Sequence, residues 1–159
     1  MEHARIEDID SWMGPATGKR SLTKALGATD VALNHYVLEP GESFAFGYHE
    51  HDDQEEMFYV VEGEATFETG GRDGGETVTV GAGEAVRFAP GEWQQGWNRG
   101  DEQVVALAIG APQESGETTI LRECADCGER TEQEIQQTEA KDALVTLCLD
   151  CGAETGRFD

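Results

Sequence analysis

The chain has 159 residues, of which 33 are acidic and 11 basic, and its formal net charge is −22 at pH 7. Such a field repels phosphate backbones, which argues against DNA or RNA as a partner. The longest apolar run, residues 104–111, is far too short to cross a bilayer, and the first ten residues are charged rather than apolar. We therefore expect a cytoplasmic protein with no membrane partner.

The basic residues comprise only three lysines against eight arginines. An acidic, lysine-poor composition resembles that of proteins from salt-accumulating halophiles, whose carboxylates stay hydrated while molar salt screens their mutual repulsion. An acidic protein from an ordinary cell is the alternative. The composition favours the halophilic interpretation.

Residues 1–29 are expected to form a lead-in to the first domain. A short extended piece is predicted near Ile6. Residues 21–27 predict a single helical turn, because Ser21 is a favourable N-cap and Gly27 is a typical helix stop.

Residues 30–112 predict an all-β domain. Short apolar stretches alternate with Gly, Pro and Asp, and no window sustains the spacing of a long helix. Eight short strands joined by tight turns indicate a jelly-roll barrel. The predicted strands are residues 31–39, 43–51, 55–63, 64–70, 76–81, 84–90, 92–98 and 102–110.

The second and third of these strands carry a candidate metal site. Residues two apart on a strand share a face, so His49 and His51 point the same way. We expect an antiparallel hairpin to set the carboxylate of Glu56 opposite the two imidazoles. Two histidines and one carboxylate form a facial triad, which suits Fe(II) and also allows Mn, Ni, Zn or Cu.

The spacing of these residues resembles the first motif of the cupin superfamily: His49, one residue, His51, four residues, Glu56, six residues, Gly63. Residues 83–98 resemble the second motif of that family and follow the first in the family's order. The resemblance covers residues 30–112 and implies a cupin barrel with a divalent metal. The whole chain also looks like cupin-domain proteins of haloarchaea.

Gln94 stands where the resemblance places a third metal-binding histidine. A Gln carbonyl oxygen is a weaker ligand than imidazole for these metals, so we expect Gln94 to be a weak fourth ligand or to face a water. A metal-free, degenerate pocket is the alternative. His35, on the preceding strand, is a candidate substrate-binding or supporting residue, although a lone histidine on a strand more often has a structural role.

Residues 113–119 are polar and lack periodicity, so we expect a linker there, followed by a separate module over residues 120–159. This module holds all four cysteines of the chain, in two Cys-x-x-Cys pairs separated by 20 residues. The spacing resembles a zinc ribbon and predicts a structural zinc bound by four thiolates; paired redox dithiols and an iron–sulfur site are the alternatives. The predicted ligands are Cys124, Cys127, Cys148 and Cys151. Arg122 and Arg130 are expected to offset the charge of the thiolates.

Two classes of function remain open at this level. One is a metal-dependent enzyme that acts on a small polar substrate, by oxygenation, isomerisation or hydrolysis. The other is a non-catalytic module in which the barrel senses a small molecule or metal and the ribbon docks a partner. The cupin resemblance also implies a homodimer. No nucleophile constellation and no phosphate-binding loop is present in the sequence.

Overall fold

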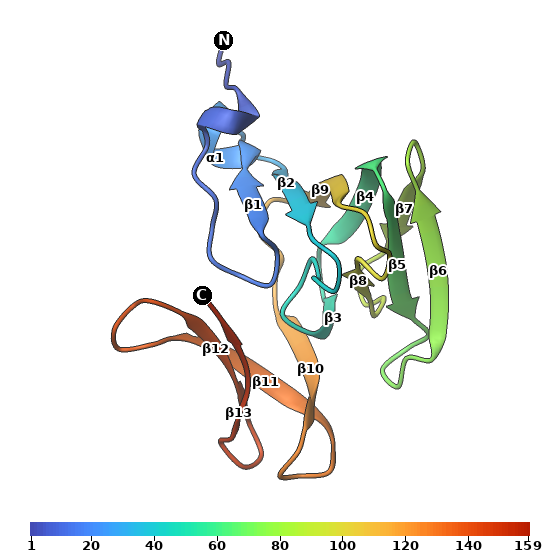
Figure 1. Cartoon of the computed structure of the whole chain (residues 1–159), viewed down its shortest axis with the longest axis vertical. Coiled ribbons are helices and arrows are strands. Elements are labelled where there is room, and N and C mark those ends of the chain that lie inside the picture. Colours follow the sequence, from blue (N-terminus) through green and yellow to red (C-terminus); the bar gives the residue numbers. More distant parts are fainter.

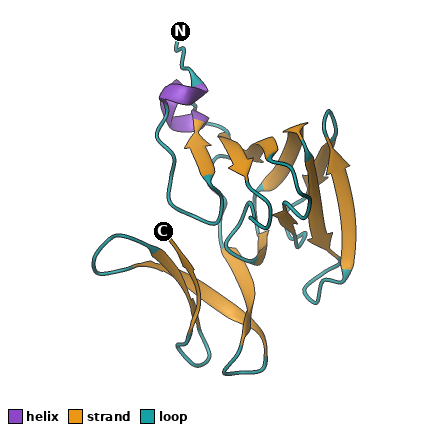
Figure 2. Ribbon diagram, in the orientation of Figure 1, coloured by secondary structure: helices purple, strands orange, loops and turns teal.

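The computed structural model describes all of residues 1–159. It is almost entirely β-structure, with one short α-helix and one turn of 3-10 helix near the N-terminus (Figures 1 and 2). The elements are η1 (Ile6–Asp8), β1 (Gly18–Ser21), α1 (Leu22–Leu26), β2 (Ala32–Leu38), β3 (Tyr48–His51), β4 (Glu55–Glu62), β5 (Glu64–Thr69), β6 (Glu76–Gly81), β7 (Ala85–Phe88), β8 (Gln95–Trp97), β9 (Val104–Ala111), β10 (Thr118–Cys124), β11 (Glu129–Gln137), β12 (Leu144–Cys148) and β13 (Glu154–Phe158).

The first part of the chain folds as a jelly roll, which confirms the predicted fold class. One sheet has the order β1-β2-β9-β4-β7, and a second has the order β6-β5-β8. Isolated bridges join Ser43 to Trp97 and His49 to Gln94, and they tie the second predicted strand, residues 43–51, to β8 and to the residue before it. These two sheets enclose the barrel interior. No helix of the structure is long and apolar enough to span a membrane.

An aromatic cluster fills the barrel between the two sheets. Phe44, Phe58 and Phe67 are each at most 5% exposed. The rings of Phe44 and Phe67 stack with centroids 5.7 Å apart, and Phe58 packs at 4.9 Å from Phe67. Strand β9 alternates buried and half-buried residues along its whole length, as expected for a strand with one face on a core. The core therefore fixes the positions of the strands that carry the site.

The lead-in is more structured than its sequence indicated. The predicted helical turn is present as α1, where the Ser21 hydroxyl accepts a hydrogen bond from the Lys24 amide and Gly27 ends the helix at φ 64°. The prediction of an extended piece near Ile6 was wrong, because the 3-10 helix η1 occupies that position. The extended segment lies instead at β1, which pairs antiparallel with β2.

Strands β3 and β4 do not form the expected hairpin. Strand β4 pairs with β7 and β9, whereas β3 pairs with β10. The two strands thus belong to different sheets, and residues 52–54 carry the chain across the barrel between them. His49 and His51 face Glu56 across the interior rather than along one ladder.

The C-terminal strands are built onto the barrel. The sheet order is β13-β12-β11-β10-β3, so a barrel strand is the edge of the C-terminal sheet (Figure 1). Strand β10 begins at Thr118, inside the segment 113–119 that the sequence predicted as a linker. Pairing with β3 engages the backbone of Thr118 and Thr119, the last two residues of this segment, and local composition gives no sign of that pairing.

Candidate metal centres

The three residues of the predicted facial triad meet inside the barrel. His49 and His51 project from β3 with ring centroids 5.0 Å apart, and Glu56 projects from β4. The Glu56 Oε2 atom lies 3.8 Å from His49 Nε2 and 3.6 Å from His51 Nε2. Ligand atoms of all three residues lie within 4.8 Å of one another, so this group could hold a metal ion.

Hydrogen bonds orient both imidazoles toward this point. His49 Nδ1 lies 3.0 Å from the carbonyl oxygen of Gly47, which can only accept, so Nδ1 carries the proton. His51 Nδ1 lies 2.8 Å from Thr118 Oγ1, whose hydroxyl can donate onward to Ser115 Oγ at 3.4 Å. Each ring then turns an unprotonated Nε2 toward Glu56, which is the form that binds a metal.

Glu56 supplies a negative charge in a confined position. Its side chain is 19% exposed. Burial acts to raise the pKa of this carboxyl, but hydrogen bonds and positive charge from His49 and His51, when no metal is bound and their Nε2 atoms are protonated, outweigh that effect and lower the pKa to about 2. The group is therefore a carboxylate at neutral pH, and a bound cation would compensate its charge.

Gln94 lies beside Glu56 and His49, where the sequence placed it, and the residue is 2% exposed. Its Nε2 donates to Glu56 Oε2 at 2.8 Å and lies 3.0 Å from His49 Nε2. Its Oε1 is buried and has no hydrogen-bond partner. Rotation of the amide by about 180° about its terminal bond exchanges the two atoms and turns an oxygen ligand toward the triad.

These residues open into a pocket of about 340 Å³, a size suited to a small molecule. Part of its floor is the aromatic core, through Phe44 and Phe58. The C-terminal sheet contributes one wall, through Ile120 and Ile135, and Thr118 lies beside His51. The pocket is therefore shared between the two parts of the chain.

His35 does not line this pocket. The pocket-lining residues of β2 are Ala32, Asn34 and Tyr36, and the alternation of a strand turns His35 to the opposite face. There it pairs across the sheet with Arg20, and burial together with that arginine lowers the pKa of its imidazole. The geometry gives no support to a substrate-binding role for His35.

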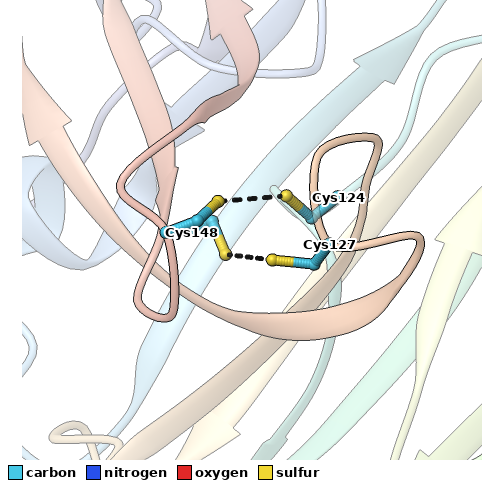
Figure 3. A group of neighbouring side chains, drawn as sticks. Cys124, Cys127 and Cys148 are labelled. Carbon is cyan, nitrogen blue, oxygen red and sulfur yellow. Dashed lines mark hydrogen bonds between the residues drawn. The ribbon is translucent and has the colours of Figure 1, made fainter.

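The four cysteines form a second cluster, at the far end of the C-terminal sheet. The turn between β10 and β11 faces the turn between β12 and β13, with the sulfur atoms between them (Figure 3). The Sγ atoms of Cys124 and Cys151 are 3.5 Å apart, and those of Cys127 and Cys148 are 3.8 Å apart. A tetrahedral zinc with Zn–S bonds of about 2.3 Å requires sulfur atoms about 3.8 Å apart, so this cluster fits the ion.

The chemistry of the cluster also suits a cation. The Thr131 hydroxyl lies 3.1 Å from Cys148 Sγ and is the main reason why the pKa of that thiol is lowered to about 6. Hydrogen bonds with the thiols of Cys151 and Cys124 raise the pKa of Cys127. Thiols packed this closely resist joint ionisation unless a metal compensates the charge, and all four are free cysteines.

Arg122 and Arg130 do not lie where they were expected to offset the charge of the cysteine thiolates, because both make their hydrogen bonds elsewhere. Arg122 donates hydrogen bonds to the carbonyl oxygens of Phe46 and Thr155, and Arg130 donates to Glu68 in the barrel at 3.1 Å. Neither guanidinium hydrogen-bonds a sulfur atom. The two arginines hold the C-terminal sheet against the barrel instead.

Sequence reasoning missed the contribution of Thr118. It lies opposite His51 in the β3–β10 ladder, and its hydroxyl meets the imidazole. The only signal in the sequence is a pair of threonines in a polar segment, which does not specify a partner 67 positions away. The contact depends on strand pairing between two parts of the chain that were expected to be separate.

The comparisons with known proteins agree with this geometry. The family model described as "Cupin domain" matches residues 34–110. The matched segment contains His49, His51 and Glu56, and it covers the jelly roll from β2 to β9 except for one or two residues at each end. The chain therefore contains a cupin domain, followed by a four-cysteine module. Among curated proteins, none matches the chain.

Solved structures show the same fold at low sequence identity. A sugar phosphate isomerase of the cupin superfamily from Silicibacter pomeroyi is 19% identical, with a TM-score of 0.61 over 96% of this chain and 91% of that chain. A conserved Klebsiella pneumoniae protein with a double-stranded β-helix domain is 18% identical, with a TM-score of 0.60 over 76% of this chain and 97% of that chain. The oxalate decarboxylase of Bacillus subtilis is 20% identical, with a TM-score of 0.59 over 73% of this chain and 31% of that chain.

Proposed function

We propose that this chain is a metal-dependent cupin enzyme that acts on a small polar substrate. The observation that carries the proposal is the convergence of His49 Nε2, His51 Nε2 and a Glu56 carboxylate oxygen at the end of a pocket. Two histidines and a carboxylate with open positions are the ligand set of non-haem Fe(II) sites, and Mn, Ni or Zn are also compatible with it. Among the similar structures are an isomerase and an oxalate decarboxylase, which is consistent with several reaction types on this fold.

Different residues of the chain would bind the metal, orient its ligands and exclude water. A bound divalent metal would polarise a substrate oxygen as a Lewis acid. Glu56 and the two histidines hold it, while the Gly47 carbonyl and the Thr118 hydroxyl fix the rings in the metal-binding tautomer. The aromatic floor of the pocket excludes water from one side.

Gln94 distinguishes this site from a four-ligand site. In the rotated orientation its Oε1 is a weak neutral ligand, which leaves the metal less tightly held than a third imidazole would. A weakly held position exchanges readily with substrate. The same feature also supports the second candidate, a sensor whose barrel binds metal or a small molecule without turning it over.

We propose a structural zinc for Cys124, Cys127, Cys148 and Cys151. A module of this size has little core of its own, and metal binding supplies free energy of folding. After Leu121, the module has four buried apolar side chains: Cys124, Ala143, Val145 and Cys148. The zinc would therefore hold the two turns together.

Elemental analysis of the protein after loading with excess Mn²⁺ and Zn²⁺ and gel filtration tests both sites. The wild type is expected to hold two metals per chain, and His49→Ala only the one in the cysteine cluster. Cys124→Ser is expected to lose the zinc and keep the barrel metal. His35→Ala is the matched control, because it removes a β2 imidazole outside the pocket, and it should retain both metals.

An unchanged metal content in His49→Ala would refute the barrel site. Loss of one and the same metal in His49→Ala and Cys124→Ser would refute two separate sites. The enzyme and the sensor differ in a further observation. An enzyme consumes its substrate at the metal, whereas a sensor gives only saturable binding and a thermal shift.

A further inference from the structure

The lining of the pocket is formally neutral, although the molecule as a whole is strongly acidic. The protein carries a net charge of −22, yet the only charged side chains that line the pocket, apart from the two histidines, are Glu56 and Lys19. Lys19 is half-buried, and no carboxylate lies within salt-bridge distance of its ammonium group. A half-buried, unpaired ammonium in so acidic a protein requires an explanation.

Lys19 is held at the pocket by strand pairing. It lies opposite Tyr36 in the β1–β2 ladder, and its Nζ is 5.5 Å from the centre of that ring. Tyr36 is 5% exposed and lines the pocket together with Glu56. Burial raises the pKa of the Tyr36 phenol; Lys19 opposes this shift and Glu56 adds to it, so the phenol is under the influence of both charges.

The loaded site therefore favours an anion. Glu56 contributes one negative charge, Lys19 one positive charge and a divalent metal two positive charges, which leaves the loaded pocket with a formal charge of +2. In a partly desolvated cavity these charges interact more strongly than in water. A neutral ligand would leave them uncompensated, whereas a carboxylate would compensate them.

The rest of the lining determines the kind of anion. Phosphate groups are usually held by several charged or backbone donors, such as arginine forks or successive backbone amides. This pocket has one ammonium and no arginine, and its other polar side chains outside the metal site are neutral: Asn34, Tyr36, Gln54, Gln113, Ser115 and Thr118. Apolar side chains also line the pocket, among them Phe46, Ile120 and Ile135. A small organic acid with an apolar body fits this lining.

We infer that the pocket binds a small carboxylic acid, whose carboxylate is held between the metal and Lys19 and whose apolar part contacts the C-terminal sheet. This inference rests on the proposed metal site and adds the substrate class. Lys19, from the lead-in, and Tyr36, from the first barrel strand, are the residues that select for the charge of the ligand.

Isothermal titration of the manganese-loaded protein with benzoate, benzamide and inorganic phosphate tests the inference. The titrations are made at the lowest KCl concentration at which circular dichroism shows the protein folded. Benzoate is expected to bind, and benzamide, which has nearly the same shape without the charge, is expected to bind at least tenfold more weakly. Lys19→Met is expected to weaken benzoate binding at least tenfold, and Lys24→Met is the matched control because that lysine is exposed and stacks on Trp12 outside the pocket.

Equal binding of benzoate and benzamide, or unchanged benzoate binding by Lys19→Met, would overturn the inference. Tighter binding of phosphate than of benzoate would replace the carboxylate class by a phosphate ligand and would also overturn it. The manganese content of each variant is measured first. Protein whose barrel takes up neither manganese nor another divalent metal contradicts the proposed function, whereas manganese-loaded protein that does not bind benzoate contradicts only the inference about the ligand.

Discussion

At the scale of single residues, the site depends on which nitrogen of each imidazole carries the proton. The backbone carbonyl of residue 47 fixes the ring of His49, and a substitution at residue 47 does not remove that carbonyl. The hydroxyl of Thr118 fixes His51, and a side chain can be removed. The two histidines therefore differ in how easily their orientation can be perturbed.

Thr118→Val is expected to lower the affinity of the barrel for Mn²⁺ by about 10- to 100-fold, the usual effect of removing a hydrogen-bond partner of a metal-binding histidine. Valine has nearly the shape of threonine and keeps the β10 backbone, so the loss would report the hydroxyl. Thr118→Ser restores the hydroxyl and should restore most of the affinity. Competition with a chelator measures the affinity, and equal values for the wild type and Thr118→Val would show that the hydrogen bond is dispensable.

At the scale of elements, the junction between β3 and β10 connects the two parts of the molecule. The chain at Gly47 approaches β10 so closely that an added Cβ atom would lie 2.6 Å from the carbonyl oxygen of Leu121. Backbone cannot move away as a flexible side chain does. Glycine is required at this position because of the close approach of the two strands.

Gly47→Ala is accordingly expected to destabilise the protein by about 1–3 kcal/mol, because β10 must shift or the chain at residue 47 must distort. The shift would also move Thr118 and Ile120, so the affinity of the barrel for Mn²⁺ should fall. Gly100→Ala is the matched control, since its added Cβ atom would approach only Asn98 Oδ1, at 3.7 Å. Thermal unfolding measures the effect, and equal melting temperatures for the two variants would contradict the close packing of this junction.

The sequence predicted those parts of the site that depend on local periodicity. The alternation of a strand places His49 and His51 on one face, and the same rule places Glu56, Phe58 and Val60 on the inner face of β4. Two Cys-x-x-Cys turns predicted the cysteine cluster for the same reason, because each pair is a local structure.

Other parts depend on pairing between distant segments and could not be predicted. The expected hairpin of β3 and β4 was wrong, since β3 takes β10 as its partner. The role of Lys19 depends on the pairing of β1 with β2, and neither β1 nor its register has a local signature. His35 lies on the strand before the first motif, as predicted, but its distance from that motif along the chain does not say which face of β2 it occupies.

At the scale of the whole molecule, the dominant feature is the net charge of −22. Few of the 33 acidic side chains are compensated: the arginine–carboxylate pairs include Arg72–Glu132 and Arg130–Glu68. Repulsion among the other carboxylates opposes the compact state, and this repulsion weakens as the Debye length falls from about 10 Å at 0.1 M salt to about 3 Å at 1 M. The origin from a halophile and the homodimer remain predictions.

The melting temperature is expected to rise when KCl is increased from 0.1 M to 2 M, because screening lowers the repulsion in the folded state more than in the expanded unfolded chain. The metal content is kept constant by adding Zn²⁺ and Mn²⁺ in excess, since metal binding also stabilises the folded state. Calorimetry at several KCl concentrations measures the effect. A melting temperature that is constant or falls with KCl would contradict the account of the acidic surface.

An anomalous difference map from crystals of the manganese-loaded protein, recorded above and below the manganese edge, would locate the barrel metal directly. We expect a manganese peak within bonding distance of the Nε2 atoms of His49 and His51 and of a Glu56 carboxylate oxygen, separate from any metal at the four cysteines. Manganese absent from the barrel of fully loaded protein, or bound only at surface carboxylates, would contradict the proposed barrel site.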